Sequence, residues 1–282
     1  MRNSHLTQKI VFSLLFLATL LIIIPVLLIV IIIIQKGLPA ITWEFLFDIP
    51  RQGMRAGGIF PAIVGTFYLV SGAILFALPV GLLAAIYLAE YAKQNFLSRL
   101  IKLSIVNLAG VPSVVYGLFG LSLFVVFLGF GASILSGSLT LGIMILPIII
   151  TSSQESLESV PDSFRETSLS LGASRWQTIR HVVLPNAIPG IITGTILGLG
   201  RAAGETAPIL FTAAAFYLPQ LPSSIFDQVM ALPYHLYVIS TQVPNVAEKT
   251  RYGTALVLLV LVLAMNLVAI LIRAKYRKRK KW

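Results

Sequence analysis

Two oppositely charged residues, Arg201 and Glu205, lie within a long apolar stretch of the sequence. A charge near the centre of a bilayer costs at least about 2.5–3.5 kcal/mol, so charged residues there are usually paired and functional. A guanidinium offers a planar fork of donors that fits a tetrahedral oxyanion, and it stays charged in a poorly solvated pathway. The pair therefore predicts a pathway for an anion, phosphate above all. This chemistry does not separate phosphate from sulfate or molybdate, and an ion pair that only locks two helices is the competing interpretation.

The spacing of this stretch places the pair on one face of a helix. At about 100° per residue, a stripe of roughly 80° contains Gly190, Gly194, Gly198, Arg201, Glu205 and Pro208. A separation of four residues lets Arg201 and Glu205 pair with each other, and the glycines allow a neighbouring helix to approach closely. We expect both charged side chains to face protein or a pathway rather than lipid.

The polar segment 152–185 contains two sets of helix signals. Ser159 followed by an acid three residues later predicts a capped helix start, and Gly172 suits the left-handed turn that ends a helix. Ser174-Arg175-Trp176-Gln177 is a second capping box, and we expect the helix that it starts to end at Pro185. The segment is thus predicted to be two short helices joined by a glycine elbow, projecting into the cytoplasm.

The composition is that of a membrane protein. Hydrophobic residues make up 57% of the 282 residues and charged residues only 11%, far below the share of about a quarter that is typical of soluble domains. Apolar runs of about 20 residues recur, and each can cross a hydrocarbon core roughly 30 Å thick as a helix. The net charge of +11 does not indicate nucleic-acid binding, because the basic residues flank the apolar runs. Without cysteine, disulfides and thiolate chemistry are excluded, and three histidines far apart in sequence suggest no metal cluster.

Six spans are predicted, at 10–34, 61–89, 103–128, 138–151, 186–213 and 253–272. The first is too long for a signal-peptide core, so we expect it to remain as a span. Fifteen Lys and Arg residues fall on one side of these spans and five on the other, which predicts a multi-pass protein with both termini cytoplasmic.

This pattern divides the chain into three parts. Residues 1–60 form the first span and an interfacial outer segment, 61–272 form the main transmembrane domain, and 273–282 form a basic cytoplasmic tail that suits anionic lipid. The outer loop 214–250, rich in proline and aromatic residues, is expected to cover the mouth of a pathway.

The polar segment resembles a motif of a known transporter family. Glu166-Thr167-Ser168, three residues, Gly172, nine residues and Val182-Val183-Leu184-Pro185 are similar to the EAA motif of binding-protein-dependent ABC importer permeases. Thr167 and Ser168 replace two alanines of that motif, and Val182 replaces an isoleucine. The resemblance implies an all-α, type I importer permease fold, in which this loop docks on an ATPase subunit. An ordinary helical hairpin is the alternative.

Other segments resemble the PstA family of phosphate importer permeases. They are Gly57–Thr66, Gly110–Gly117, Gly200–Pro208 and Ala231–Pro233. The ending Glu205-Thr206-Ala207-Pro208 favours this family over that of the PstC sister permease. The resemblance implies a PstC-like partner permease, two copies of a PstB-like ATPase and an external, PstS-like phosphate-binding protein in a bacterial inner membrane. The chain has no G-x-x-x-x-G-K-[ST] phosphate loop, so we expect no catalytic residues and no bound cofactor, with ATP and Mg²⁺ held by the separate ATPase.

Several rival functions remain open on sequence alone. A permease for sulfate, molybdate or an amino acid would keep the same cytoplasmic loop. An ion channel or an ion-driven carrier is a different class, against which that loop argues. A membrane enzyme is a further alternative because four acids cluster at Glu155, Glu158, Asp162 and Glu166, but on a loop whose charges we expect to face water.

Overall fold

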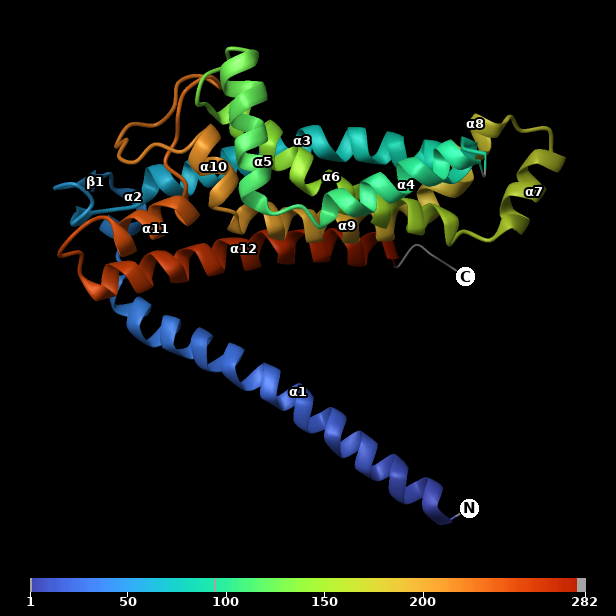
Figure 1. The fold of residues 1–282 in the computed structure, drawn as a ribbon, viewed down its shortest axis with the longest axis horizontal. Coiled ribbons are helices and arrows are strands. Elements are labelled where there is room, and N and C mark those ends of the chain that lie inside the picture. The colour runs from blue at the N-terminus through green and yellow to red at the C-terminus, as the bar shows by residue number, and fades with distance from the viewer. Residues whose placement is uncertain (1, 94, 278–282) are drawn as a thin grey trace.

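The computed structural model describes residues 2–93 and 95–277. It is a helical bundle (Figure 1), and the only strands in the described residues are β1 (Pro50–Arg51) and β2 (Ala56–Gly57), an antiparallel pair. The 3-10 and π turns are η1 (Leu38–Ala40), η2 (Tyr87–Tyr91), η3 (Leu121–Phe127) and η4 (Ile179–Val183). The α-helices are α1 (Arg2–Gly37), α2 (Trp43–Phe47), α3 (Phe60–Ile86), α4 (Phe96–Ala109), α5 (Ser113–Gly120), α6 (Ile134–Glu158), α7 (Asp162–Ser170), α8 (Arg175–Thr178), α9 (Leu184–Gly204), α10 (Ala207–Thr212), α11 (Leu232–Thr241) and α12 (Glu248–Arg277).

Five continuous helices in the described residues are long and apolar enough to cross a membrane. They run over Gln8–Ala40, Phe60–Tyr91, Ile134–Glu158, Arg175–Gly204 and Glu248–Tyr276. A sixth crossing exists if α4 and the helix Ser113–Phe127 form one bent span. The chain is therefore an integral membrane protein, as its composition predicts.

The third predicted span, 103–128, is not one straight helix. α4 ends at Ala109, and the helix that begins at Ser113 is turned by 103°. Pro112 explains the break because it lacks an N–H group and disfavours a helical conformation at the residue before it. The Tyr116 hydroxyl donates to the Leu108 carbonyl at 2.7 Å, which satisfies one carbonyl that the end of α4 leaves open.

The fourth predicted span, 138–151, was too short, because α6 continues to Glu158 through four serine and glutamine positions. These polar residues remain helical since a serine can return its hydroxyl to its own helix. Ser156 Oγ donates to the Ser152 carbonyl at 2.6 Å. The same two serines pack against Gly190 and Gly194 of α9, where a Cβ atom would overlap them.

α6 forms the centre of the bundle. It packs against α3, α9, α4, α5 and α10. The core between α3 and α6 contains fully buried apolar side chains such as Leu69, Leu141, Ile145 and Ile149. α6 is thereby the element against which the others are positioned.

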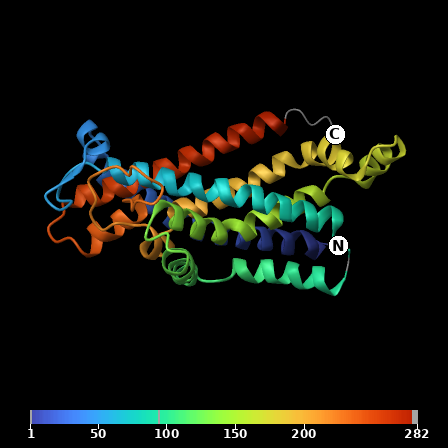
Figure 2. The same cartoon turned by 90° about the horizontal axis from the view of Figure 1, so that it is seen from above.

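Both ends of the described chain lie at the same end of the bundle as α7 and α8, whereas β1, α2 and α11 lie at the opposite end (Figures 1 and 2). α1 diverges from the bundle and contacts α12 near its own C-terminal end, where Lys36 pairs with Glu248 at 2.7 Å. This arrangement agrees with an even number of crossings. Of the predicted basic tail, residues 273–277 continue α12, and 278–282 lie outside the described residues.

We predict that a cysteine placed at Asn3 is protected from a membrane-impermeant thiol reagent in intact cells, whereas a cysteine at Ser223 is labelled. The reason is the excess of basic residues at the end that holds α7, and the chain has no native thiol to interfere. Labelling at residue 3 and protection at residue 223 would reverse the orientation. The tail position Lys280 tests the same point, although it lies outside the described residues.

Candidate functional site

The charged pair lies at a break between two helices. α9 ends at Gly204, Glu205 is extended (φ −77°, ψ 135°), and α10 begins at Ala207. The prediction of one helix over 186–213 was therefore wrong, as was the single helical stripe that included Pro208. In a continued helix, Pro208 would have to donate to the Gly204 carbonyl, but it has no N–H and its ring would clash there.

The structure nevertheless brings Arg201 and Glu205 together. Arg201 Nε lies 3.6 Å from Glu205 Oε1, and the side chains are 29% and 19% exposed. This distance is within ion-pair range but too long for a hydrogen bond. Within the described residues, no hydrogen bond from the Arg201 side chain is present. The guanidinium thus has a nearby counter-charge while its donors remain available for an anion.

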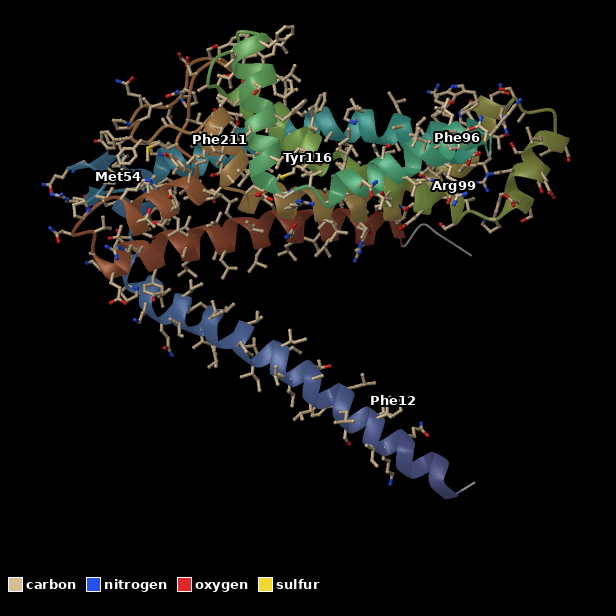
Figure 3. The ribbon with its side chains drawn as sticks, viewed as in Figure 1. Phe12, Met54, Phe96, Arg99, Tyr116 and Phe211 are labelled. Atoms are coloured by element: carbon tan, nitrogen blue, oxygen red, sulfur yellow. The ribbon has the colours of Figure 1, made fainter. Side chains whose placement is uncertain are left out.

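The bent span formed by α4 and α5 packs against this break. A Cβ atom at Gly117 would lie 2.8 Å from the Phe211 ring and 3.0 Å from the Ala207 carbonyl, so α5 and α10 approach closely. The Tyr116 hydroxyl is close enough to Arg201 for an electrostatic interaction. Figure 3 labels Tyr116 and Phe211 in this region.

A segment of the outer loop also reaches the pair. Residues 229–233 return into the bundle, where the Leu232 N–H donates to Thr66 Oγ1 of α3 at 2.8 Å. A Cβ atom at Gly65 would overlap the Met230 carbonyl, so this contact requires glycine. Thr66, Glu205 and Pro233 are among the residues that line a cavity of about 10 Å³, near the smallest volume that holds one water. The outer loop is therefore part of the core beside Glu205.

The polar segment 152–185 has the predicted elbow. Gly172 follows α7 with φ +84°, the left-handed conformation that favours glycine. Ser174 and Gln177 form the predicted capping box. Two predictions about helix ends in this segment were wrong, one at Ser159 and one at Pro185. Ser159 does not cap α7; it ends α6, and its hydroxyl donates to the Ser156 carbonyl at 2.8 Å.

Pro185 does not end the second helix. It lies in the first turn of α9, after the π turn η4, and the helix runs unbroken over Arg175–Gly204. Proline is tolerated here because the π turn directly before it already interrupts the regular i→i−4 hydrogen-bond pattern of the helix. The elbow at Gly172 is thus directly continuous with the helix that carries Arg201.

Arg165 fastens α7 to the bundle, a role that the sequence analysis missed. Its Nη2 donates to Glu90 Oε1 at 2.8 Å and to the Leu157 carbonyl at 2.9 Å, and its Nη1 donates to the Val160 carbonyl at 2.6 Å. The side chains of Arg165 and Glu90 are only 18% and 8% exposed. This pair joins α7 to the ends of α3 and α6. The sequence feature that could have indicated this ion pair is Glu90, an acid at the end of an apolar run.

The outer face of the elbow carries apolar side chains. Leu171 is 84% exposed, and Leu169 and Trp176 are about half exposed. Glu166 and Pro185 are also exposed, while Leu184 is partly buried. Exposed apolar side chains that gather on a projection commonly mark a protein interaction site.

The two sets of predicted residues do not form one site. Leu184 and Arg201 lie at opposite ends of α9, separated by about 25 Å at 1.5 Å per residue. No group of three potential metal ligands occurs among the described residues. His235 on α11 is 3% exposed, and burial lowers its pKa to about 4, so this imidazole is neutral at pH 7.

Comparison with known sequences identifies a family. The family described as "Binding-protein-dependent transport system inner membrane component" matches residues 77–282. The chain is 34% identical over 281 residues to a probable ABC transporter permease protein, YqgI, of Bacillus subtilis, which covers 95% of each chain. It is 35% identical over 254 residues to the phosphate transport system permease protein PstA 1 of Mycobacterium tuberculosis, covering 88% of this chain and 82% of the relative.

Comparison with solved structures supports the fold. A chain in the crystal structure of a bacterial alginate ABC transporter, in complex with an alginate pentasaccharide-bound periplasmic protein, superposes with a TM-score of 0.68. The match covers 92% of each chain at 15% sequence identity. At this identity the likeness shows the fold alone, which is that of an ABC importer permease.

We predict that Gly172→Val impairs coupling, whereas Gly172→Asn largely preserves it. No atom lies within 4 Å of a Cβ at this position, so the penalty comes from the positive φ, which asparagine tolerates and a β-branched residue does not. The measurements are copurification of the ATPase and substrate-stimulated ATP turnover. Normal values for Gly172→Val would exclude a role for the elbow in coupling.

We predict that Glu90→Gln lowers the thermal midpoint of the purified importer and weakens ATPase retention. The substitution leaves the partly buried Arg165 with only the exposed carboxylate of Asp162, at 3.2 Å, as a counter-charge, and the loss costs at most about 3 kcal/mol. Glu248→Gln is the matched control because it breaks an exposed pair with Lys36, where little stability depends on the contact. Equal behaviour of the two variants would show that Arg165 does not hold α7.

Proposed function

Because this chain belongs to the family of binding-protein-dependent transport system inner membrane components, we propose that it is the permease subunit of an ATP-driven importer of inorganic phosphate. The observation that carries the choice of an anion is the Arg201 guanidinium, which lies at a helix break with a carboxylate at 3.6 Å and no hydrogen bond among the described residues. The relative named a phosphate transport permease, at 35% identity, supports phosphate among the oxyanions.

The geometry suggests how Arg201 would serve transport. A phosphate that arrives competes with Glu205 for the same donors, since a carboxylate and a phosphate dianion repel at close range. Glu205 then returns to Arg201 when phosphate leaves, so the cation is never without a counter-charge. A single arginine binds weakly enough for release, which a pathway filled with donors would not allow.

The cytoplasmic elbow is the proposed docking site for an ATPase. Leu171, Leu169 and Trp176 provide an apolar surface, and the Arg165–Glu90 pair gives α7 a rigid attachment. Movement of the ATPase would reach Arg201 through the unbroken helix Arg175–Gly204. The chain contains no phosphate-loop motif, so this mechanism requires a separate ATPase that holds ATP and Mg²⁺. The resemblance to phosphate importers implies two copies of that subunit.

Two further partners complete the proposal. A sister permease would form the other wall of the pathway, because Arg201 is 29% exposed in the isolated chain. An external phosphate-binding protein would deliver substrate to the end that carries α2 and α11. The alginate transporter with its bound periplasmic protein offers a precedent for such a complex on this fold. The proposed location is a bacterial inner membrane with both termini cytoplasmic.

We predict that Arg201→Gln abolishes uptake of radiolabelled phosphate, that Arg201→Lys retains part of it, and that Glu205→Gln retains some. Glutamine keeps length and polarity but removes the charge, and an ammonium cannot make the planar two-point contact. Uptake is measured in a strain without other phosphate transporters and normalised to complex abundance. Arg55→Gln, which removes an exposed cation at the outer end, is the control.

Near-normal uptake by Arg201→Gln would make the pair purely structural. Uptake of sulfate or molybdate in place of phosphate would assign another oxyanion to the same site. Uptake that persists without ATP would favour an ion-driven carrier or a channel.

A further inference from the structure

A large groove lies at the cytoplasmic end of the bundle, away from Arg201. It has a volume of about 800 Å³ and lies between η2, α4 and the end of α6. Figure 3 places Phe96 and Arg99 at the end of the molecule that carries α7 and α8.

The groove has an excess of positive charge. Lys93, Arg99 and Lys102 line it, and Glu158 is its one acid. Glu158 is already engaged, since it lies 3.6 Å from Lys102 Nζ and accepts a hydrogen bond from Gln154 at 2.7 Å. Lys93 and Arg99 have no ion-pair partner within the part of the chain that the structure describes. Two cations are therefore left for an anion from outside the chain.

The polarity of the groove changes along α4. The cations Arg99 and Lys102 lie in the first two turns of α4. Leu103 and Val106 also line the groove and lie further toward the C-terminal end of the same helix. Val106 lies about 10 Å beyond Arg99 along the helix axis, at 1.5 Å per residue. No residue of α4 is buried in the isolated chain, and Leu103 and Val106 are more than half exposed. A ligand that fills this groove needs an anionic end and an apolar end in that order.

We propose that this groove binds an anionic phospholipid of the inner leaflet, with its phosphate at Lys93 and Arg99 and an acyl chain along Leu103 and Val106. Basic pockets between transmembrane helices on the cytoplasmic side are suited to such head groups. Free phosphate shares the anionic chemistry but would leave the apolar wall uncovered. The proposal is independent of the transported substrate.

The site has a structural consequence for the elbow. One wall of the groove is formed by Leu88 and Ala89 of η2, the turn that presents Glu90 to Arg165, and by Ala92 directly after it. A lipid in the groove would pack against η2 and would thereby restrain Glu90, which pairs with Arg165 and holds α7. Anionic lipid would in this way stabilise the attachment of the elbow.

The test counts lipids retained by the intact, purified importer complex in native mass spectrometry. The complex is mixed with equal amounts of phosphatidylglycerol and phosphatidylcholine. The wild-type complex is expected to prefer phosphatidylglycerol. The double variant K93Q/R99Q is expected to reduce that preference about thirtyfold, because each basic residue near a membrane surface contributes about 1 kcal/mol. The control R55Q/K249Q removes two exposed cations at the outer end and is expected to leave the preference unchanged.

Two further measurements identify the occupant. L103S/V106S is expected to weaken retention of phosphatidylglycerol while keeping both cations, and it tests the acyl-chain wall on a helix with no buried residue. A photo-reactive phenylalanine analogue at Phe96, whose side chain is 81% exposed, is expected to crosslink to lipid.

Unchanged lipid preference in K93Q/R99Q overturns the proposal. Displacement of the lipid by millimolar inorganic phosphate, with L103S/V106S behaving as wild type, would assign the groove to free phosphate instead. Crosslinking of position 96 to another subunit, with no lipid retained, would assign it to a protein interface.

Discussion

The structure depends on a constraint that hydrocarbon imposes on the peptide backbone. Within a bilayer, every backbone polar group needs a partner, so a broken helix is tolerated only where protein or a polar cavity covers it. The helix is broken after α9, close to Pro208, and the break leaves Glu205 extended beside Arg201. The elements around the break can be understood as its cover. α5 lies against α10 through Gly117, and residues 229–233 return from the outer loop to donate a hydrogen bond to Thr66.

A second consequence is that the charged pair and the elbow at Gly172 are joined by one helix. The π turn η4 joins α8 to α9, so the helix runs from Arg175 to Gly204 without interruption despite Pro185. Arg165 holds α7 to the ends of α3 and α6, so the elbow is attached at two points. Under the proposed mechanism, a displacement at the elbow would reach Arg201 along one continuous helix.

Features that depend on neighbours in sequence were predictable. The apolar runs identified the membrane helices, the Ser174–Gln177 capping box formed as expected, and Gly172 adopts the left-handed conformation. Pro112 and Pro208 accompany the two helix breaks, but proline alone could not have predicted them, because Pro25, Pro79, Pro147 and Pro189 lie inside unbroken helices. Conversely, the polar end of α6 was misjudged because serines that bond to their own helix do not end it.

Contacts between distant residues were beyond the reach of sequence patterns. Arg165 and Glu90 are 75 residues apart, and Leu232 and Thr66 are 166 apart. Nothing in local spacing selects these partners. The segments that resemble known permeases were recognised separately, and only the structure shows that Thr66, Gly117, Pro208 and Pro233 lie around one helix break.

The central claim is that a positive charge at position 201 carries the substrate anion, and chemical rescue tests it most directly. The chain lacks cysteine, so Arg201→Cys offers a single thiol on this subunit beside the pathway. After treatment with a cationic aminoethyl thiosulfonate reagent, phosphate uptake by this variant should recover substantially, whereas a neutral methyl reagent should leave it inactive. Equal recovery with both reagents, or none with the cationic one despite complete modification, would contradict the account.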